Sequence, residues 1–168
     1  LKQRGIASSG DKKSSVFDAP EVGVFLSLLK VINNPTDDVA FLSLMLSPLY
    51  GFTADELAEL KLPDKKRKLI ACLREAADHD EKCARLLFDL NSYRKQAAVM
   101  PFDAYIRTLL DRTGYLAVVS AMKHGEVRRR NLILLCEFAA SYAENGGSGI
   151  SGFLRYIARA AENGADIP

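Results

Sequence analysis

Apolar residues recur at intervals of three and four along most of this chain, and no segment alternates polar and apolar residues over five or more positions. This spacing matches the period of an α-helix, whereas a half-buried strand needs a period of two. No repeat of fixed length is present, so a solenoid is not expected. The pattern therefore predicts an all-α fold, an irregular multi-helix bundle of about eight helices. The clearest series is Phe102, Tyr105, Ile106, Leu109 and Leu110.

Local residues indicate where helices start and end. We expect Asp18 and Thr36 to cap the first two helices, because short polar side chains accept hydrogen bonds from free N–H groups. Thr53–Glu56 has the form of a capping box, and Gly114 stands where a left-handed residue often ends a helix. The first helix has apolar residues on both sides and should be buried nearly all round. The expected apolar stripe of the second helix is Val39, Leu42, Met45 and Leu46. The expected core residues are Phe25, Leu29, Leu42, Leu86, Leu90, Ile106, Leu110, Leu135, Phe138 and Leu154.

Length and composition narrow the class of protein. The 168 residues suit one domain with its own core, and a chain that begins at Leu1 suggests a segment of a longer protein. The net charge is only +2, so any nucleic-acid contact must come from local basic patches. No apolar run of about 18 residues could cross a membrane, and we expect no secretory signal. The three cysteines suit reduced, buried thiols and a cytoplasmic location.

No catalytic motif is complete. Residues 5–14 resemble a phosphate loop, but Asp11 separates the second glycine from Lys12, where the motif needs the lysine. Neither His79 nor His124 has a nucleophile or carboxylate partner at helical spacing, and no ligands gather at the spacing of a zinc site. We therefore expect no catalytic residue, cofactor or metal in this segment, and no ATPase or nuclease activity from it alone.

Basic residues gather in three places, each of which could be a solvated face or a patch that binds an anion. Arginines at a helix start oppose the helix dipole, so they need a partner anion more than the others. The clusters are Lys61 with Lys65–Lys68 at a corner between two helices, Arg128–Arg130 at a helix start, and Arg155 with Arg159.

Several stretches together resemble a known family. They are similar to the UvrD-like superfamily-1 DNA helicases, and most of all to the AddA family of bacterial ATP-dependent helicase/nucleases, which act in double-strand-break repair. The stretches, in the family's order, are Phe17–Val22, Leu28–Pro35, Asp37–Val39, Leu46–Leu57, Arg112–Tyr115, Arg130–Leu132 and Phe153–Ile157.

The resemblance implies that residues 17–168 are the inserted helical subdomain called 2B. Residues 1–16 would be a flexible linker or the end of the flanking RecA-like lobe. The segment lies between the family's motor motifs, so ATP, magnesium and the exonuclease site would belong to the rest of the parent chain. An inserted subdomain leaves and re-enters its host at neighbouring points, so the ends near Phe17 and Ile167 should lie close together.

In this family the subdomain contacts duplex DNA ahead of the motor through a turn that offers backbone N–H groups. Residues 48–53 occupy the matching place, but Gly51-Phe52-Thr53 lacks the second glycine of the relatives' Gly-Ile-Gly. An exposed turn that opens a helix still attracts an anion. We expect weak contact with duplex DNA, independent of base sequence. The residues expected to make it are Tyr50, Gly51, Phe52, Thr53, Lys61, Lys65, Lys66 and Arg67.

The sequence leaves other functions open. The turn at 48–53 could be a plain connection between helices. The segment could instead be a protein-interaction module that docks a partner nuclease subunit or regulates the parent motor lobes, or an unrelated helical adaptor. DNA contact through phosphates weakens steeply with salt, whereas contact through an apolar face does not, so a salt titration separates these functions.

Overall fold

A computed structural model describes residues 15–163 of the chain. Within that range nine α-helices and one short 3-10 helix are present and strands are absent, which confirms the all-α prediction. The expectations for residues 1–14, including the phosphate-loop lookalike, and for Ile167 lie outside the described residues. The elements are η1 (Val16–Asp18), α1 (Pro20–Asn33), α2 (Asp38–Leu46), α3 (Ala54–Lys61), α4 (Leu69–Ala76), α5 (Glu81–Ala97), α6 (Phe102–Thr113), α7 (Tyr115–Ser120), α8 (Gly125–Glu144) and α9 (Ile150–Glu162).

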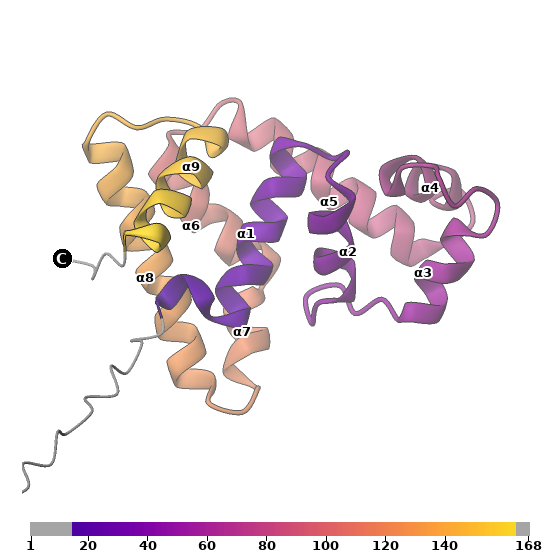
Figure 1. Ribbon diagram of the computed structural model, residues 1–168, viewed down its shortest axis with the longest axis horizontal. Helices are drawn as coiled ribbons and strands as arrows, with labels where there is room; N and C mark the ends of the chain where they lie inside the picture. The colour runs from indigo at the N-terminus through magenta and orange to yellow at the C-terminus, as the bar shows by residue number, and fades with distance from the viewer. Residues whose placement is uncertain (1–14, 164–168) are drawn as a thin grey trace, which may run out of the picture.

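Helix α1 lies in the middle of the body, with α6 to α9 on one side and α2, α3 and α4 on the other (Figure 1). It packs against α2, α5, α8 and α9. Its apolar residues are buried on almost every side, as the sequence predicted. The 17-residue helix α5 runs from the α3–α4 end of the molecule back to α6, and it therefore connects the two sides.

Most of the predicted core is confirmed, and α2 is the main correction. Leu154 is only half-buried. In α2, Val39 is 79% exposed, Leu42 42% and Leu46 47%, so of the predicted stripe only Met45 is buried. The helix is apolar nearly all round, so its period alone could not show which face would pack on α1 and α4. The predicted core residues that are buried are Phe25, Leu29, Leu86, Leu90, Ile106, Leu110, Leu135 and Phe138.

Two predicted helix caps are wrong by one position or more. Asp37, and not Thr36, caps α2, since its carboxylate accepts the N–H of Ala40 at 3.1 Å. Thr36 instead donates its hydroxyl to Asn34 Oδ1 at 2.7 Å. Asp18 belongs to a capping box of η1, whereas α1 begins at Pro20 without a side-chain cap. Proline tolerates that position because it has no N–H to satisfy.

Other local predictions are confirmed. The capping box of Thr53 and Glu56 is present, and Gly114 has the left-handed φ of 67°. The three cysteines are free thiols; Cys72 and Cys83 are buried and Cys136 is half-buried. Burial raises the pKa of the Cys83 and Cys136 thiols to about 11. No helix within 15–163 has both the length and the hydropathy that crossing a bilayer requires.

The first and last described helices are neighbours. The ring of Phe138 in α8 packs on Phe17 of η1 at 4.9 Å between centroids and on Tyr156 of α9 at 6.4 Å. Helix α9 also packs along α1. This arrangement agrees with the prediction of neighbouring ends as far as residue 163.

One basic residue of the Arg128–Arg130 cluster has the partner anion that we expected. Glu21, in the first turn of α1, is almost completely buried, and its two carboxylate oxygens accept hydrogen bonds from Arg128 Nη1 and Asn131 Nδ2, each at 2.7 Å. This ion pair fixes the start of α8 to the start of α1. Arg129 and Arg130 are exposed.

Arg128→Met should destabilise the fold by about 2 to 4 kcal/mol, because it leaves a buried carboxylate without its counter-charge. Urea unfolding followed by circular dichroism measures this free energy. The matched control is Arg129→Met, which removes the same charge from an exposed position and should cost less than about 0.5 kcal/mol. Equal effects of the two variants would show that the buried pair contributes nothing of its own.

Candidate nucleic-acid interface

The turn between α2 and α3 is built around a buried serine and a left-handed glycine. Ser47 Oγ donates to the carbonyl of Leu44 at 2.6 Å and accepts the N–H of Leu49 at 3.3 Å. Gly51 has a φ of 63°, and a Cβ there would meet open space, so the position needs glycine for its backbone conformation. Phe52 then points inward and is buried.

The backbone N–H groups of the predicted contact residues are already used inside the protein. Gly51 N–H donates to Ser47 O at 2.7 Å, Phe52 N–H to Met45 O at 2.9 Å, and Thr53 N–H to Glu56 Oε2 at 2.6 Å. In this conformation none of them points freely to a phosphate. The next two N–H groups, of Ala54 and Asp55, belong to the first turn of α3 and have no partner within the helix. These exposed residues are the ones that could receive an anion.

Tyr50 attaches the turn to α5. Its hydroxyl donates to Asp89 Oδ2 at 3.2 Å. Burial and the nearby Asp89 carboxylate raise the pKa of Tyr50 well above its usual value, so it remains a neutral donor. Tyr50 is thus half-buried and positions the turn from behind, whereas Gly51 and Thr53 are exposed.

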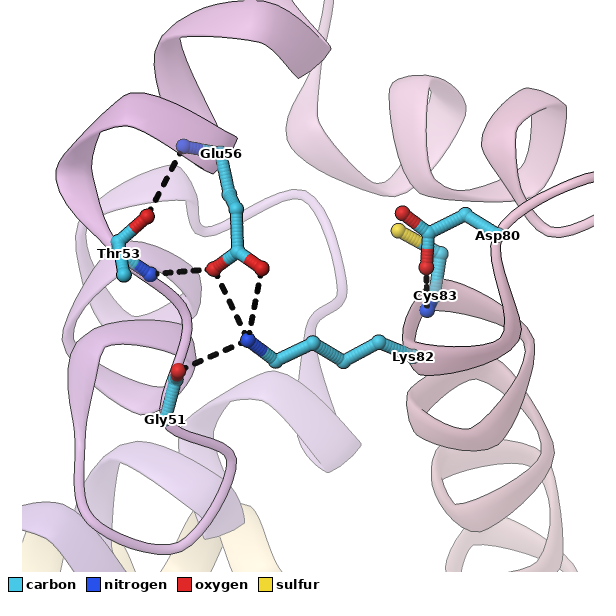
Figure 2. A network of polar contacts seen from close by, with 6 residues as sticks. All are labelled: Gly51, Thr53, Glu56, Asp80, Lys82 and Cys83. Atoms are coloured by element: carbon cyan, nitrogen blue, oxygen red, sulfur yellow. Dashed lines mark hydrogen bonds and ion pairs between the residues drawn. The ribbon is translucent and has the colours of Figure 1, made fainter.

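Lys82, at the start of α5, is the residue of this site that the sequence did not indicate. Figure 2 shows its ammonium between Gly51 and Glu56: it donates to Gly51 O at 2.8 Å and to the two oxygens of Glu56 at 2.9 and 3.0 Å. It also lies 4.5 Å from the centre of the Phe52 ring, in reach of a cation–π interaction. One lysine therefore contacts the carbonyl, the aromatic ring and the helix start that define the turn.

The carboxyl group of Glu56 has two sets of donors. Lys82 and the N–H of Thr53 both bond its charged form and so lower its pKa from the ordinary value, with Lys82 as the larger cause. Its own N–H in turn donates to Thr53 Oγ1 at 3.2 Å. The capping box and the ion pair thus share a single carboxylate at the start of α3 (Figure 2).

The predicted lysines and arginine lie at the opposite end of α3 from the turn. The helix has eight residues, which separates its ends by about 12 Å. Lys61 donates to the carbonyl of Arg67, and Arg67 pairs with Glu75, so both are used locally. Lys65 and Lys66 are fully exposed and pair with no carboxylate in the described part of the chain. The structure thus separates the predicted site into the turn and an exposed pair of lysines.

A groove of about 290 Å³ between α3 and α4 is unsuited to phosphate. Five carboxylates line it, and Arg67 is the only arginine or lysine among its lining residues. Among residues 15–163 no three metal-ligating side chains gather, so the groove is not a metal centre. Phosphate could therefore approach Lys65 and Lys66 only outside this groove. The carboxylates belong to Glu56, Glu59, Asp64, Glu75 and Asp80.

Comparison with known proteins identifies the class of protein from which this fold and turn come. No family model matches the sequence. The chain is 36% identical over 172 residues to the ATP-dependent helicase/nuclease AddA of Acetivibrio thermocellus, and 33% identical over 171 residues to that of Thermoanaerobacter sp. (strain X514). It is 33% identical over 170 residues to that of Clostridium botulinum. These matches cover 97 to 99% of this chain and 14% of each relative.

The chain is thus related, along nearly its whole length, to one segment of a bacterial helicase/nuclease. In sequence it belongs to the AddA family of ATP-dependent helicase/nucleases, and it spans 14% of the length of the curated relatives it matches. This confirms the resemblance drawn from the sequence.

Lys82→Met should raise the pKa of Glu56 towards its ordinary value, because the variant loses the donor that contributes most to the shift. The pKa can be measured by NMR titration of the Glu56 side-chain carboxyl. Since the folded pKa is the lower one, the stability that the ion pair gives is present at neutral pH and is lost as the pH falls through that value. A Glu56 pKa that is the same in both proteins would exclude Lys82 as the cause.

Proposed function

We propose that this chain is a non-catalytic helical segment of an ATP-dependent helicase/nuclease, equivalent to the 2B subdomain, and that it contacts duplex DNA ahead of the motor. The observation that supports it most is the exposed pair Lys65 and Lys66, without described partners, on the same helix–turn element that the family resemblance assigns to DNA. Contacts with phosphate hold a protein on DNA but do not read base sequence. We therefore propose binding that is weak and independent of sequence.

In this proposal the activity of the whole protein belongs to other parts of the longer chain. ATP and magnesium would bind the motor lobes, and the exonuclease would lie beyond this segment. The segment itself would bind no cofactor. Its partners would be duplex DNA, the motor lobes of the same polypeptide and a partner nuclease subunit in the bacterial cytoplasm.

Lys65→Glu/Lys66→Glu should weaken binding to a labelled duplex and flatten its salt dependence by about one unit of slope for each phosphate that the variant no longer touches. Fluorescence anisotropy across a salt series measures both quantities. For the isolated segment we expect dissociation constants on the order of micromolar or weaker, as is usual for non-specific binding.

The matched control is Arg129→Glu/Arg130→Glu, which makes the same change in net charge on exposed residues of α8. In Figure 1 the start of α8 lies far from the α3–α4 end of the body. The control should leave the salt slope almost unchanged. If the two double variants lose affinity and slope equally, only net charge matters, and Lys65 and Lys66 would not be a contact site.

The exposed face of α2 favours a second function, as a protein-interaction module. Val39, Leu42 and Leu46 follow the spacing i, i+3, i+7 on one side of a helix whose other side is in the core. A helix that is apolar on all sides is usually covered on all sides. This face could dock the motor lobes or a partner nuclease subunit.

Val39→Ser/Leu46→Ser distinguishes that function. Since both residues are exposed, the pair should change the stability of the segment by less than about 1 kcal/mol and leave its DNA affinity unchanged. Introduced into the full-length protein, it should reduce co-purification of the partner nuclease subunit if α2 is the docking face. Unchanged co-purification, together with unchanged ATP-driven unwinding by the full-length protein, would reject this second function.

A further inference from the structure

Lys82 lies far along the chain from the turn that it contacts. It is 31 residues from Gly51 and 26 from Glu56, and it belongs to a different helix. No family motif or basic cluster in the sequence includes it. Its three acceptors and the Phe52 ring all belong to the turn at 48–53 or to the first turn of α3.

We propose that Lys82 is the positioning residue of this turn: it holds Gly51 and Phe52 in place, and it balances the carboxylate of Glu56 so that a phosphate can approach the start of α3. The inference rests on the proposed DNA contact and adds to it a residue that acts without touching DNA.

The hydrogen-bonding capacity of Lys82 explains why it positions and does not bind. An ammonium group has three N–H donors, and here Gly51 O and the two oxygens of Glu56 accept from it. The charge also faces the Phe52 ring. A phosphate would have to displace one of these partners, whereas the exposed Lys65 and Lys66 have no such partners to lose.

The balance of charge at α3 explains why a phosphate needs Lys82. The helix start has a partial positive charge from its dipole, but Asp55 and Glu56 place two carboxylates in the same turn. With Lys82 present, the ammonium offsets the Glu56 carboxylate. Without it, a phosphate that approaches the N–H groups of Ala54 and Asp55 would meet two negative charges.

The role of Lys82 is separable from the stability of its own helix. Asp80 caps α5, since its carboxylate accepts the N–H of Cys83 at 3.0 Å, so the helix start does not depend on Lys82 (Figure 2). The start of α3 is equally safe in a variant, because glutamine at position 56 can still form the capping box. Single and double substitutions at these two sites can therefore be compared in folded proteins.

The experiment is a double-mutant cycle of wild type, Lys82→Met, Glu56→Gln and the double variant, each titrated with labelled duplex across a salt series. Lys82→Met should bind about three- to tenfold more weakly, the effect of one unbalanced charge several ångströms from a phosphate near water. Its salt slope should equal that of wild type. The double variant should recover to within about twofold of wild type. Lys95→Met, which removes a charge from the far part of α5, is the control and should have a smaller effect.

Three results would overturn the inference. Equal affinity of Lys82→Met and wild type would show that the turn does not need Lys82. A salt slope lower by about one unit, with no recovery in the double variant, would make Lys82 a direct phosphate contact. If wild type and every variant alike fail to bind duplex, the proposed function itself is wrong and the positioning role falls with it. Hydrogen exchange at the Gly51 amide, expected to be faster in Lys82→Met, confirms that each variant is folded and that the turn has loosened.

Discussion

Helix α1 is buried on almost every side, and the other helices are arranged around that requirement. A helix with so little polar surface cannot stay in water, since each fully buried large apolar side chain contributes about 1.5 to 3 kcal/mol. Helices α2, α5, α8 and α9 therefore surround it. Its buried charged residue, Glu21, then needs a partner inside the protein, which Arg128 supplies from α8. Side chains of α1 that are at most 3% exposed are Val22, Phe25, Leu28, Leu29, Val31 and Ile32.

The candidate site depends on the same core through α5. This helix packs against α1 and α4, and from it Lys82 and Asp89 reach the turn between α2 and α3. The turn is therefore fixed from both ends of the long helix's first half, by an ion pair at one residue and a tyrosine hydroxyl at the other. A surface loop with these attachments has little freedom to rearrange around a ligand, so a partner would meet the turn in the form described.

Charge is distributed unevenly over the α3–α4 end of the molecule. Lys65 and Lys66 face solvent, whereas the adjoining groove is lined by carboxylates. Because the segment has a net charge of only +2, long-range attraction contributes little and any DNA contact depends on local geometry. A duplex would have to approach from the side of the lysines and avoid the groove, which would limit the orientations available to it.

The amino-acid sequence was sufficient to predict the features that depend on near neighbours in the chain. The helical period, the capping box of Thr53 and Glu56, the left-handed Gly114 and most of the core followed from residues a few positions apart, where helix geometry fixes which side chains meet. The family resemblance, and with it the turn at 48–53, also came from the sequence. Three features emerged only from the folded structure: the face of α2 that packs, the pairing of Arg67 with Glu75, and the reach of Lys82 to the turn. Such features depend on contacts between segments that are distant in the chain, up to 107 residues apart for Arg128 and Glu21, and no local pattern encodes which helices will meet.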